Sequence, residues 1–191
     1  MSAAAYGAHA AEPSHARTGV LLFIVSEVTL FGAFFASYFV LRGASAAWPP
    51  TPDLHRPDLP LVALNTLVLL SSSVTMQRAV AAVARGDRAS SSRLLGATLG
   101  LGLTFLLVQA FEFSRNGFGI GDGVFGSTFY TLTGFHGAHV SAGLLAIGAL
   151  LRRANLGLLG AANAGAAEAV SYYWHFVDVV WLVLFTTVYV L

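Results

Sequence analysis

The chain has 191 residues, of which 56% are hydrophobic and only 10% are charged. Soluble domains carry about 25% charged residues, so this chain, with its charges gathered between long apolar stretches, is typical of a protein that faces lipid. The formal net charge of +1 and the absence of cysteine exclude a nucleic-acid binder, disulfides and thiolate metal sites.

A short polar segment, residues 1–16, precedes the first apolar stretch. It contains Glu12, Pro13 and two histidines, and it lacks the charged stretch, apolar core and cleavage site of a signal peptide. We therefore expect residues 1–16 to lead into a single membrane domain that spans residues 17–191.

Five apolar segments then follow along the chain. Each is close to the roughly 20 residues that a helix needs to cross the hydrocarbon core. Lipid offers no hydrogen-bond partner to the backbone, so these segments must be helical. We predict an all-α integral membrane protein, a bundle of five transmembrane helices over residues 20–41, 61–83, 94–113, 128–151 and 170–191.

The arginine distribution predicts the orientation of the bundle. With a cytoplasmic N-terminus, seven of the ten arginines lie on the inner side and three on the outer side, as the positive-inside rule favours. The outer three are Arg42, Arg56 and Arg115. We therefore predict a cytoplasmic N-terminus and a periplasmic C-terminus in a bacterial inner membrane. Trp174, Tyr172 and Tyr173, near the inner end of the last helix, fit an interfacial aromatic belt.

Six ionisable side chains fall inside the predicted helices. A charged residue at the centre of a membrane helix costs about 2.5–3.5 kcal/mol on insertion scales, so such residues face protein or water and point to function. We expect them to form an intramembrane polar network. They are Glu27, Glu112, His136, His139, His175 and Asp178.

Glu27 is the clearest of these residues. It lies about 10 Å from the inner end of the first predicted helix, and no basic residue between Phe23 and Phe39 could pair with it. Two interpretations stay open from the sequence alone. Glu27 hydrogen-bonds to a neighbouring helix, or it faces a partner subunit or a proton-conducting region.

The histidines raise the question of a metal site. His136 and His139 are three residues apart and share a helix face, as do His175 and Asp178. Helix-bundle di-metal sites, however, combine several glutamates with Glu-x-x-His pairs. Here the third residue after each helical glutamate is not histidine, but Leu30, Arg115 and Ser171. We expect no metal, no other cofactor and no catalytic residue in this chain, and interhelical hydrogen bonds at His175 and Asp178.

Small residues recur on the third and fourth predicted helices. In a membrane, glycine lets helix backbones approach closely. We expect such contacts at Gly96, Gly100 and Gly102, and at Gly134, Gly137 and Gly143.

Six blocks of sequence then occur in an order and spacing that point to one family. They are Ser26-Glu27-Val28, Leu64-Asn65-Thr66 with residues 69–73, Gln109-x-x-Glu112, Asp122-Gly123-x-x-Gly126-Ser127-Thr128, Thr133-Gly134-Phe135-His136-Gly137-x-His139-Val140 and Tyr173-Trp174-His175-Phe176-Val177-Asp178-Val179-Val180-Trp181. With these blocks, residues 18–191 resemble subunit III of the haem–copper oxidases, in its short five-helix bacterial form.

The resemblance implies a role without chemistry of its own. Subunit III packs against the catalytic subunit I, and the haems, the copper centres and the oxygen chemistry belong to subunits I and II. In this family, subunit III supports proton entry into subunit I, keeps subunit I active during turnover and provides a lipid-lined path for oxygen. Glu27 matches the family's buried, carbodiimide-reactive acid, which implies a position near the proton-uptake region.

The resemblance also implies bound phospholipid, with one departure. On the helix that corresponds to residues 20–41, family members often carry Trp and His at the positions where this sequence has Ala36 and Val40. Arg42, one turn beyond the apolar segment, could supply the phosphate contact instead, and Trp174 is a second possible lipid contact.

Three other functions are alternatives to an accessory subunit of an oxidase. A related accessory subunit serves nitric oxide reductase and shares much of the same pattern. An independent membrane metalloenzyme would hold stoichiometric metal in the isolated chain. A transporter is disfavoured, because the five segments show neither an inverted repeat nor paired broken helices.

Overall fold

A computed structural model describes residues 15–48 and 58–191 of the chain. The predicted polar segment 1–16 lies almost wholly outside the described residues. Arg56 also lies outside them. Within the described part the helices are α1 (His15–Ala44), α2 (Leu59–Ala84), α3 (Arg88–Arg115), α4 (Gly123–Asn155) and α5 (Gly165–Leu184). A short 3-10 turn, η1 (Ala161–Asn163), precedes α5, and a π-helical end, η2 (Phe185–Val190), continues it.

Five of the described helices are long and apolar enough to cross a membrane, which confirms the predicted fold class. Helices α1 to α4 are each longer than the apolar segment that predicted them, and α5 begins five residues before its predicted start and continues as η2 to Val190. Aspartates begin two of them. The N–H of Leu61 donates to Asp58 Oδ1 at 3.4 Å, and the N–H of Ser90 donates to Asp87 Oδ1 at 3.0 Å. These caps satisfy backbone donors that have no partner in a first helical turn.

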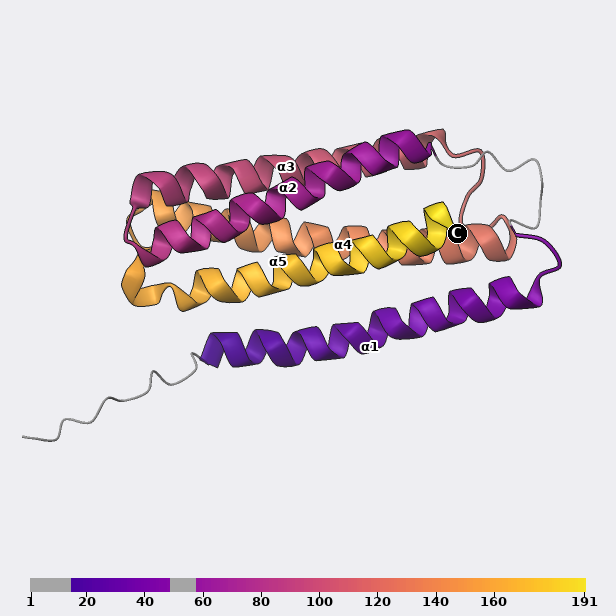
Figure 1. Ribbon diagram of the computed structural model, residues 1–191, viewed down its shortest axis with the longest axis horizontal. Coiled ribbons are helices and arrows are strands. Elements are labelled where there is room, and N and C mark those ends of the chain that lie inside the picture. The colour runs from indigo at the N-terminus through magenta and orange to yellow at the C-terminus, as the bar shows by residue number, and fades with distance from the viewer. Residues whose placement is uncertain (1–14, 49–57) are drawn as a thin grey trace, which may run out of the picture.

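Helices α2 to α5 form an antiparallel four-helix bundle, and α1 lies along its outside (Figure 1). α2 packs on α3 and α5, α4 packs on α3 and α5, and α1 packs on α5 and α4. We name the two ends of the molecule by residues. The Trp48 end also holds Asp58 and Asp122, and the Asp87 end holds the links from α2 to α3 and from α4 to α5.

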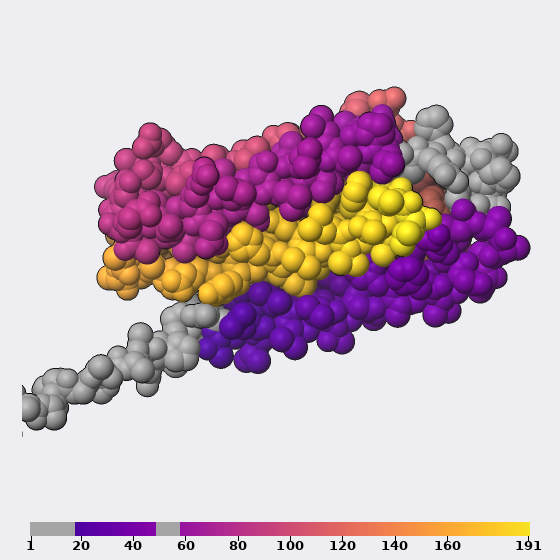
Figure 2. Space-filling view, viewed as in Figure 1, coloured from indigo at the N-terminus to yellow at the C-terminus, as the bar shows by residue number. Residues whose placement is uncertain are grey.

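The core lies inside the four-helix bundle, and α1 contributes little to it. Among the described residues of α1, only Phe31 and Tyr38 are buried. Most of the other large apolar side chains of α1 are exposed, and α1 forms a continuous layer beside α5 in Figure 2. In a membrane such a face meets lipid or another protein.

Glycine allows close packing at two positions in the bundle. A Cβ added at Gly102 would lie 2.6 Å from Leu144 and 2.9 Å from Trp174, and one at Gly143 would lie 2.7 Å from Trp174. The indole of Trp174 therefore fills the space that these two glycines leave. The expectation for Gly96, Gly100 and Gly134 was wrong, as a Cβ at any of these positions would meet nothing within 4 Å.

Candidate functional site

Glu27 of α1 pairs with His139 of α4. Glu27 Oε2 lies 2.8 Å from His139 Nε2, and each side chain is 14% exposed. Phe31 packs its ring edge on the imidazole at 4.9 Å between centroids, and the Tyr173 hydroxyl donates to the main-chain oxygen of His139 at 3.0 Å. The acid thus has a partner on a neighbouring helix and keeps a narrow exposed edge.

The surroundings of His139 fix how protons are distributed in this pair. Nδ1 lies 2.7 Å from the carbonyl oxygen of Phe135, which can only accept, so Nδ1 carries a proton. One further proton lies between Nε2 and the Glu27 carboxyl. Whether nitrogen or oxygen holds that proton, the two side chains together carry no net charge, which suits a position within the membrane.

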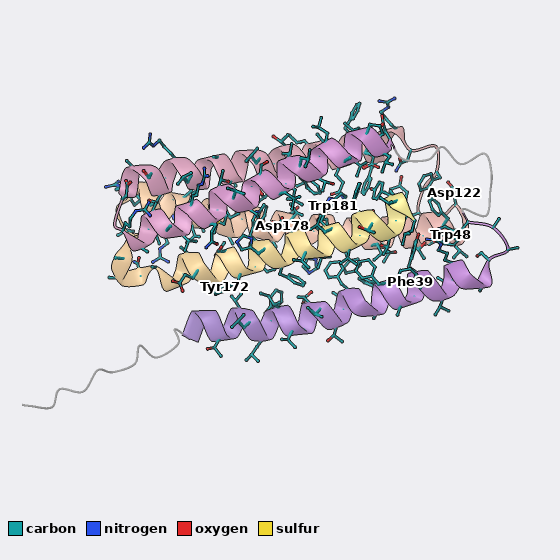
Figure 3. The ribbon with its side chains drawn as sticks, in the orientation of Figure 1. Phe39, Trp48, Asp122, Tyr172, Asp178 and Trp181 are labelled. Carbon is teal, nitrogen blue, oxygen red and sulfur yellow. The ribbon has the colours of Figure 1, made fainter. Side chains whose placement is uncertain are left out.

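A second cluster joins α2 to α5 around Ser73. Its hydroxyl donates to Asp178 Oδ2, and it also lies 2.9 Å from His175 Nδ1. His175 Nε2 lies 3.3 Å from the side-chain oxygen of Gln77. Asp178 is buried on α5, where Figure 3 labels it. The expected interhelical hydrogen bonds of His175 and Asp178 are therefore present, and Ser73 is their common partner.

Glu112 and His136 are buried at other places in the bundle. The hydroxyl of Tyr189, on the π-helical end η2, donates to Glu112 Oε2 at 3.4 Å. His136 is 0% exposed and stacks on Trp181, with 4.9 Å between ring centroids. Neither ring nitrogen of His136 has a hydrogen-bond partner among the described residues.

The predicted polar network is thus three separate clusters and one isolated imidazole. His136 and His139 have different ring contacts, because a spacing of three residues leaves them about 60° apart around the helix. His136 points into the bundle, whereas His139 faces α1. In the described ranges, no group of three or more His, Asp or Glu side chains could hold a metal ion.

The two expected lipid contacts differ in the structure. Trp174 has no exposed surface, and its indole N–H donates to Ser72 Oγ at 2.9 Å. The expectations of lipid contact and of an interfacial position for Trp174 were therefore wrong, because the ring fills the bundle core. Arg42 is partly exposed and donates to the main-chain oxygen of Leu191 at 2.7 Å. Its guanidinium has five N–H donors, so this bond leaves capacity for an anion.

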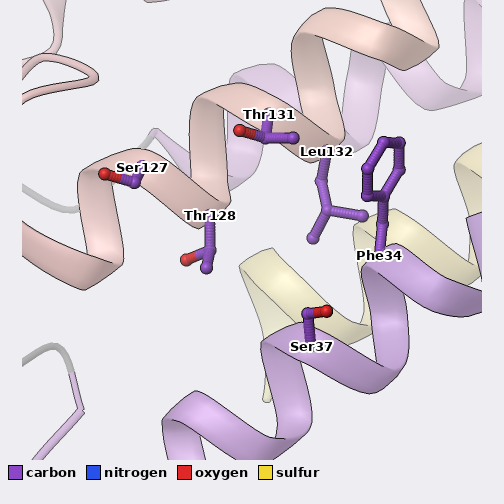
Figure 4. A pocket seen from close by; sticks show the side chains of 6 residues that line it. All are labelled: Phe34, Ser37, Ser127, Thr128, Thr131 and Leu132. Atoms are coloured by element: carbon purple, nitrogen blue, oxygen red, sulfur yellow. The ribbon is translucent and has the colours of Figure 1, made fainter.

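An open groove of about 130 Å³ lies between α1 and α4 towards the Trp48 end (Figure 4). Its walls combine apolar surface with hydroxyl groups. The lining residues are Phe34, Ser37, Ser127, Thr128, Thr131 and Leu132. The hydroxyls of Ser127 and Thr128 donate to carbonyls of their own helix or of the preceding link, which leaves their lone pairs free to accept.

Several residues of these clusters were not found by sequence reasoning. Ser73 and Gln77 carry no charge, and Tyr189 looks like one more aromatic residue in an apolar helix. A weak signal existed for Ser73, which ends a run of three serines inside an otherwise apolar segment. No comparable signal marked Tyr189.

The chain is similar to known proteins over its whole length. A family model described as cytochrome c oxidase subunit III matches residues 1–191. The chain belongs to the cytochrome c oxidase subunit III family. It is similar to cytochrome c oxidase subunit 3 of Synechocystis, with 40% identity over 96% of this chain and 78% of the relative. It is 41% identical to the probable subunit 3 of Mycobacterium tuberculosis, over 93% of this chain and 88% of that protein.

Membership in the subunit III family fixes the broad role of the chain. A third relative, subunit 3 of Thermostichus vulcanus, is 37% identical over 96% of this chain and 91% of the relative. The family model and these relatives are all described as cytochrome c oxidase subunits, which favours the oxidase over nitric oxide reductase. This subunit III is a multi-pass membrane protein and an accessory subunit within a haem–copper oxidase complex.

Proposed function

We propose that the chain packs directly against subunit I of a bacterial oxidase and supports proton uptake there, without a catalytic centre of its own. The observation that carries this proposal is the pair of Glu27 and His139. The pair joins two membrane-spanning helices, α1 and α4, holds one proton between its side chains and keeps 14% of each side chain exposed at the edge of the bundle. A shared proton at an accessible edge suits contact with a proton-handling partner.

The location of the other polar groups supports a role without cofactors. His175 and Asp178 meet Ser73, and Glu112 meets Tyr189, so these side chains hold helices together. The haems and copper then belong to subunits I and II, as the family resemblance implies. The arginine distribution supports an N-terminus in the cytoplasm of a bacterial cell with the chain in its inner membrane.

The exposed face of α1 supports direct packing on another subunit. Of the five candidate spans, α1 buries the least of itself inside this chain. Its exposed residues include Leu22, Val25 and Val28, which flank Glu27 in the sequence. At about 100° per residue these three side chains point away from Glu27 around α1, so a partner helix can pack on this face and leave the Glu27–His139 pair in place.

Bound phospholipid is the second part of the proposal. The groove between α1 and α4 offers apolar walls and hydroxyl groups to lipid chains and esters. Arg42 lies at the same end of α1 and has donors available for a phosphate. We expect Arg42→Ala to lower the phospholipid that co-purifies with the oxidase. The matched control is Arg115→Ala, in the last turn of α3. Equal lipid content in the two variants would contradict a phosphate contact at Arg42.

Purification of the oxidase with and without this chain tests the main proposal. Removal should leave the haem spectrum intact and shorten the time for which the enzyme stays active during turnover. Adding the chain back should restore that time, and adding back Glu27→Ala should restore less of it than adding back Glu168→Ala. A haem spectrum that disappears with the chain, or metal held by the isolated chain, would show that it contributes ligands.

A further inference from the structure

Buried polar atoms without partners occur on each of the four bundle helices. They are Asn65 Oδ1 on α2, Glu112 Oε1 on α3, both ring nitrogens of His136 on α4 and Asp178 Oδ1 on α5. All four side chains are at most 5% exposed. Such atoms have no hydrogen-bond partner in the described part of the chain, and in hydrocarbon each costs several kcal/mol. Asp178 belongs to the Ser73 cluster, whereas the other three lie in the halves of their helices that are nearer the Trp48 end.

The one nearest the Trp48 end is Glu112. It lies in the last turn of α3, at the end of the bundle where Asp58 is exposed before α2. Glu112 accepts a hydrogen bond from Tyr189 through Oε2 and leaves Oε1 unpaired. A buried carboxyl thus stands just inside the polar surface of this end.

Gln109 lies on α3 between Glu112 and the level of His136. It lies three residues before Glu112 on the same buried face of α3. Its amide N–H donates to the carbonyl oxygen of Thr133 at 3.5 Å, and its amide oxygen would lie 3.2 Å from a Cβ at Gly137. Thr133 is one turn before His136, and Gly137 is the next residue. The amide of Gln109 therefore lies beside the backbone that carries the imidazole.

Asn65 reaches the same region from the opposite helix. Its amide N–H donates to the carbonyl oxygen of Phe105 at 3.0 Å. The Phe105 ring lies 5.9 Å from the His136 ring and 4.8 Å from the Trp181 ring. Asn65 and His136 thus flank one aromatic residue, each with unpaired polar atoms.

Apolar packing closes the bundle beyond His136. Gly102 of α3 has Leu144 and Trp174 so close that an added Cβ would overlap them. Leu69 and Val140, from α2 and α4, are fully buried there. Polar groups therefore extend from the Trp48 end as far as His136, and a tightly packed layer follows.

We propose that the four-helix bundle binds water in a blind polar column that opens at the Trp48 end and ends at His136. Water matches these groups chemically, because one molecule both donates and accepts, which the mixture of amide, carboxyl and imidazole groups requires. The column gives His136 and Glu112 exchange of water and protons with one side of the membrane only. This inference does not depend on the proposed contact with subunit I.

Hydrogen–deuterium exchange at the histidine C2 position tests the column in the intact native oxidase. We expect the C2 proton of His136 to exchange at a measurable rate although the ring has no exposed surface. His139 and His175 serve as internal references. The backbone amides of α4 around His136 should stay protected, which separates hydration from local unfolding. A His136 that does not exchange while His139 does would overturn the proposal, as would exchange accompanied by loss of amide protection.

A variant and a direct observation complete the test. Gln109→Leu should slow exchange at His136 and leave His139 unchanged, because an apolar side chain interrupts the column. Thr104→Leu, at an exposed position on the same helix, should leave His136 exchange unchanged, since Thr104 donates only to the carbonyl oxygen of Gly100. A density map of the native oxidase that resolves ordered water should show a molecule within hydrogen-bond distance of a His136 nitrogen. A ring nitrogen bonded directly to protein, or a metal or halide ion in that place, would contradict bound water.

Discussion

Glu27 and His139 lie 112 residues apart in the sequence, yet 2.8 Å separates Glu27 Oε2 from His139 Nε2. Among the described side chains, this contact is one of three polar attachments between α1 and the four-helix bundle. The Tyr38 hydroxyl donates to the main-chain oxygen of Thr187, and Arg42 donates to that of Leu191. Because α1 buries few apolar side chains, these hydrogen bonds fix its position and rotation against α4 and α5.

The first prediction concerns this attachment. Glu27→Leu leaves His139 Nε2 without a partner and should destabilise the packing of α1 by about 1–3 kcal/mol. Glu27→Gln should lose less, because its amide N–H can donate to Nε2. Thermal release of the chain from the purified oxidase measures the difference. Equal release temperatures for the two variants would show that the hydrogen bond does not hold α1.

The helices and the buried acids could be predicted from sequence because both depend on local properties. Twenty apolar residues must form a helix in lipid, and an acid such as Glu27 is conspicuous within one. The partner of Glu27 could not be predicted, because it depends on which faces of α1 and α4 meet. The spacing of His136 and His139 suggested one shared site, and the structure places them in different surroundings.

Packing contacts were the least predictable feature. Gly96 and Gly100 have the spacing of a common motif for close helix approach. A Cβ added at either position would nevertheless meet nothing within 4 Å. Gly102 and Gly143 are the positions that matter, because the Trp174 indole from a third helix lies against both. Sequence shows small residues, whereas only the assembled bundle shows which of them face a large one.

A second prediction follows from this packing. Gly102→Ala should destabilise the bundle by about 1–3 kcal/mol, because its Cβ would overlap Leu144 and Trp174. Gly100→Ala, on the same helix with open space around it, should be neutral or stabilising, since alanine favours helix more than glycine does. Thermal unfolding of the two detergent-solubilised variants compares them. A Gly102→Ala protein as stable as Gly100→Ala would mean that Trp174 can move aside.

The third prediction concerns Ser73, whose hydroxyl serves both Asp178 and His175. Ser73→Ala should cost about 1–3 kcal/mol of stability, because it leaves a buried carboxyl oxygen without its donor. Ser71→Ala is the matched control, since Ser71 is exposed and donates only to Leu67 of its own helix. Thermal unfolding should separate the two. If Ser71→Ala were the more damaging change, Ser73 would not be the link between α2 and α5.

The last prediction uses pH at the Asp87 end, outside the membrane-spanning helices. Hydrogen bonds from Ser90 to the carboxylate lower the pKa of Asp87 from its ordinary value of 3.8. A lowered pKa in the folded state means that ionised Asp87 stabilises the start of α3 above the unfolded pKa. That contribution is lost as pH falls through the folded pKa. Wild type should therefore unfold at a higher temperature than Asp87→Ala at neutral pH, and the difference should shrink on acidification below pH about 4. A difference that stays constant or grows on acidification would show that the charge of Asp87 has no part in capping α3.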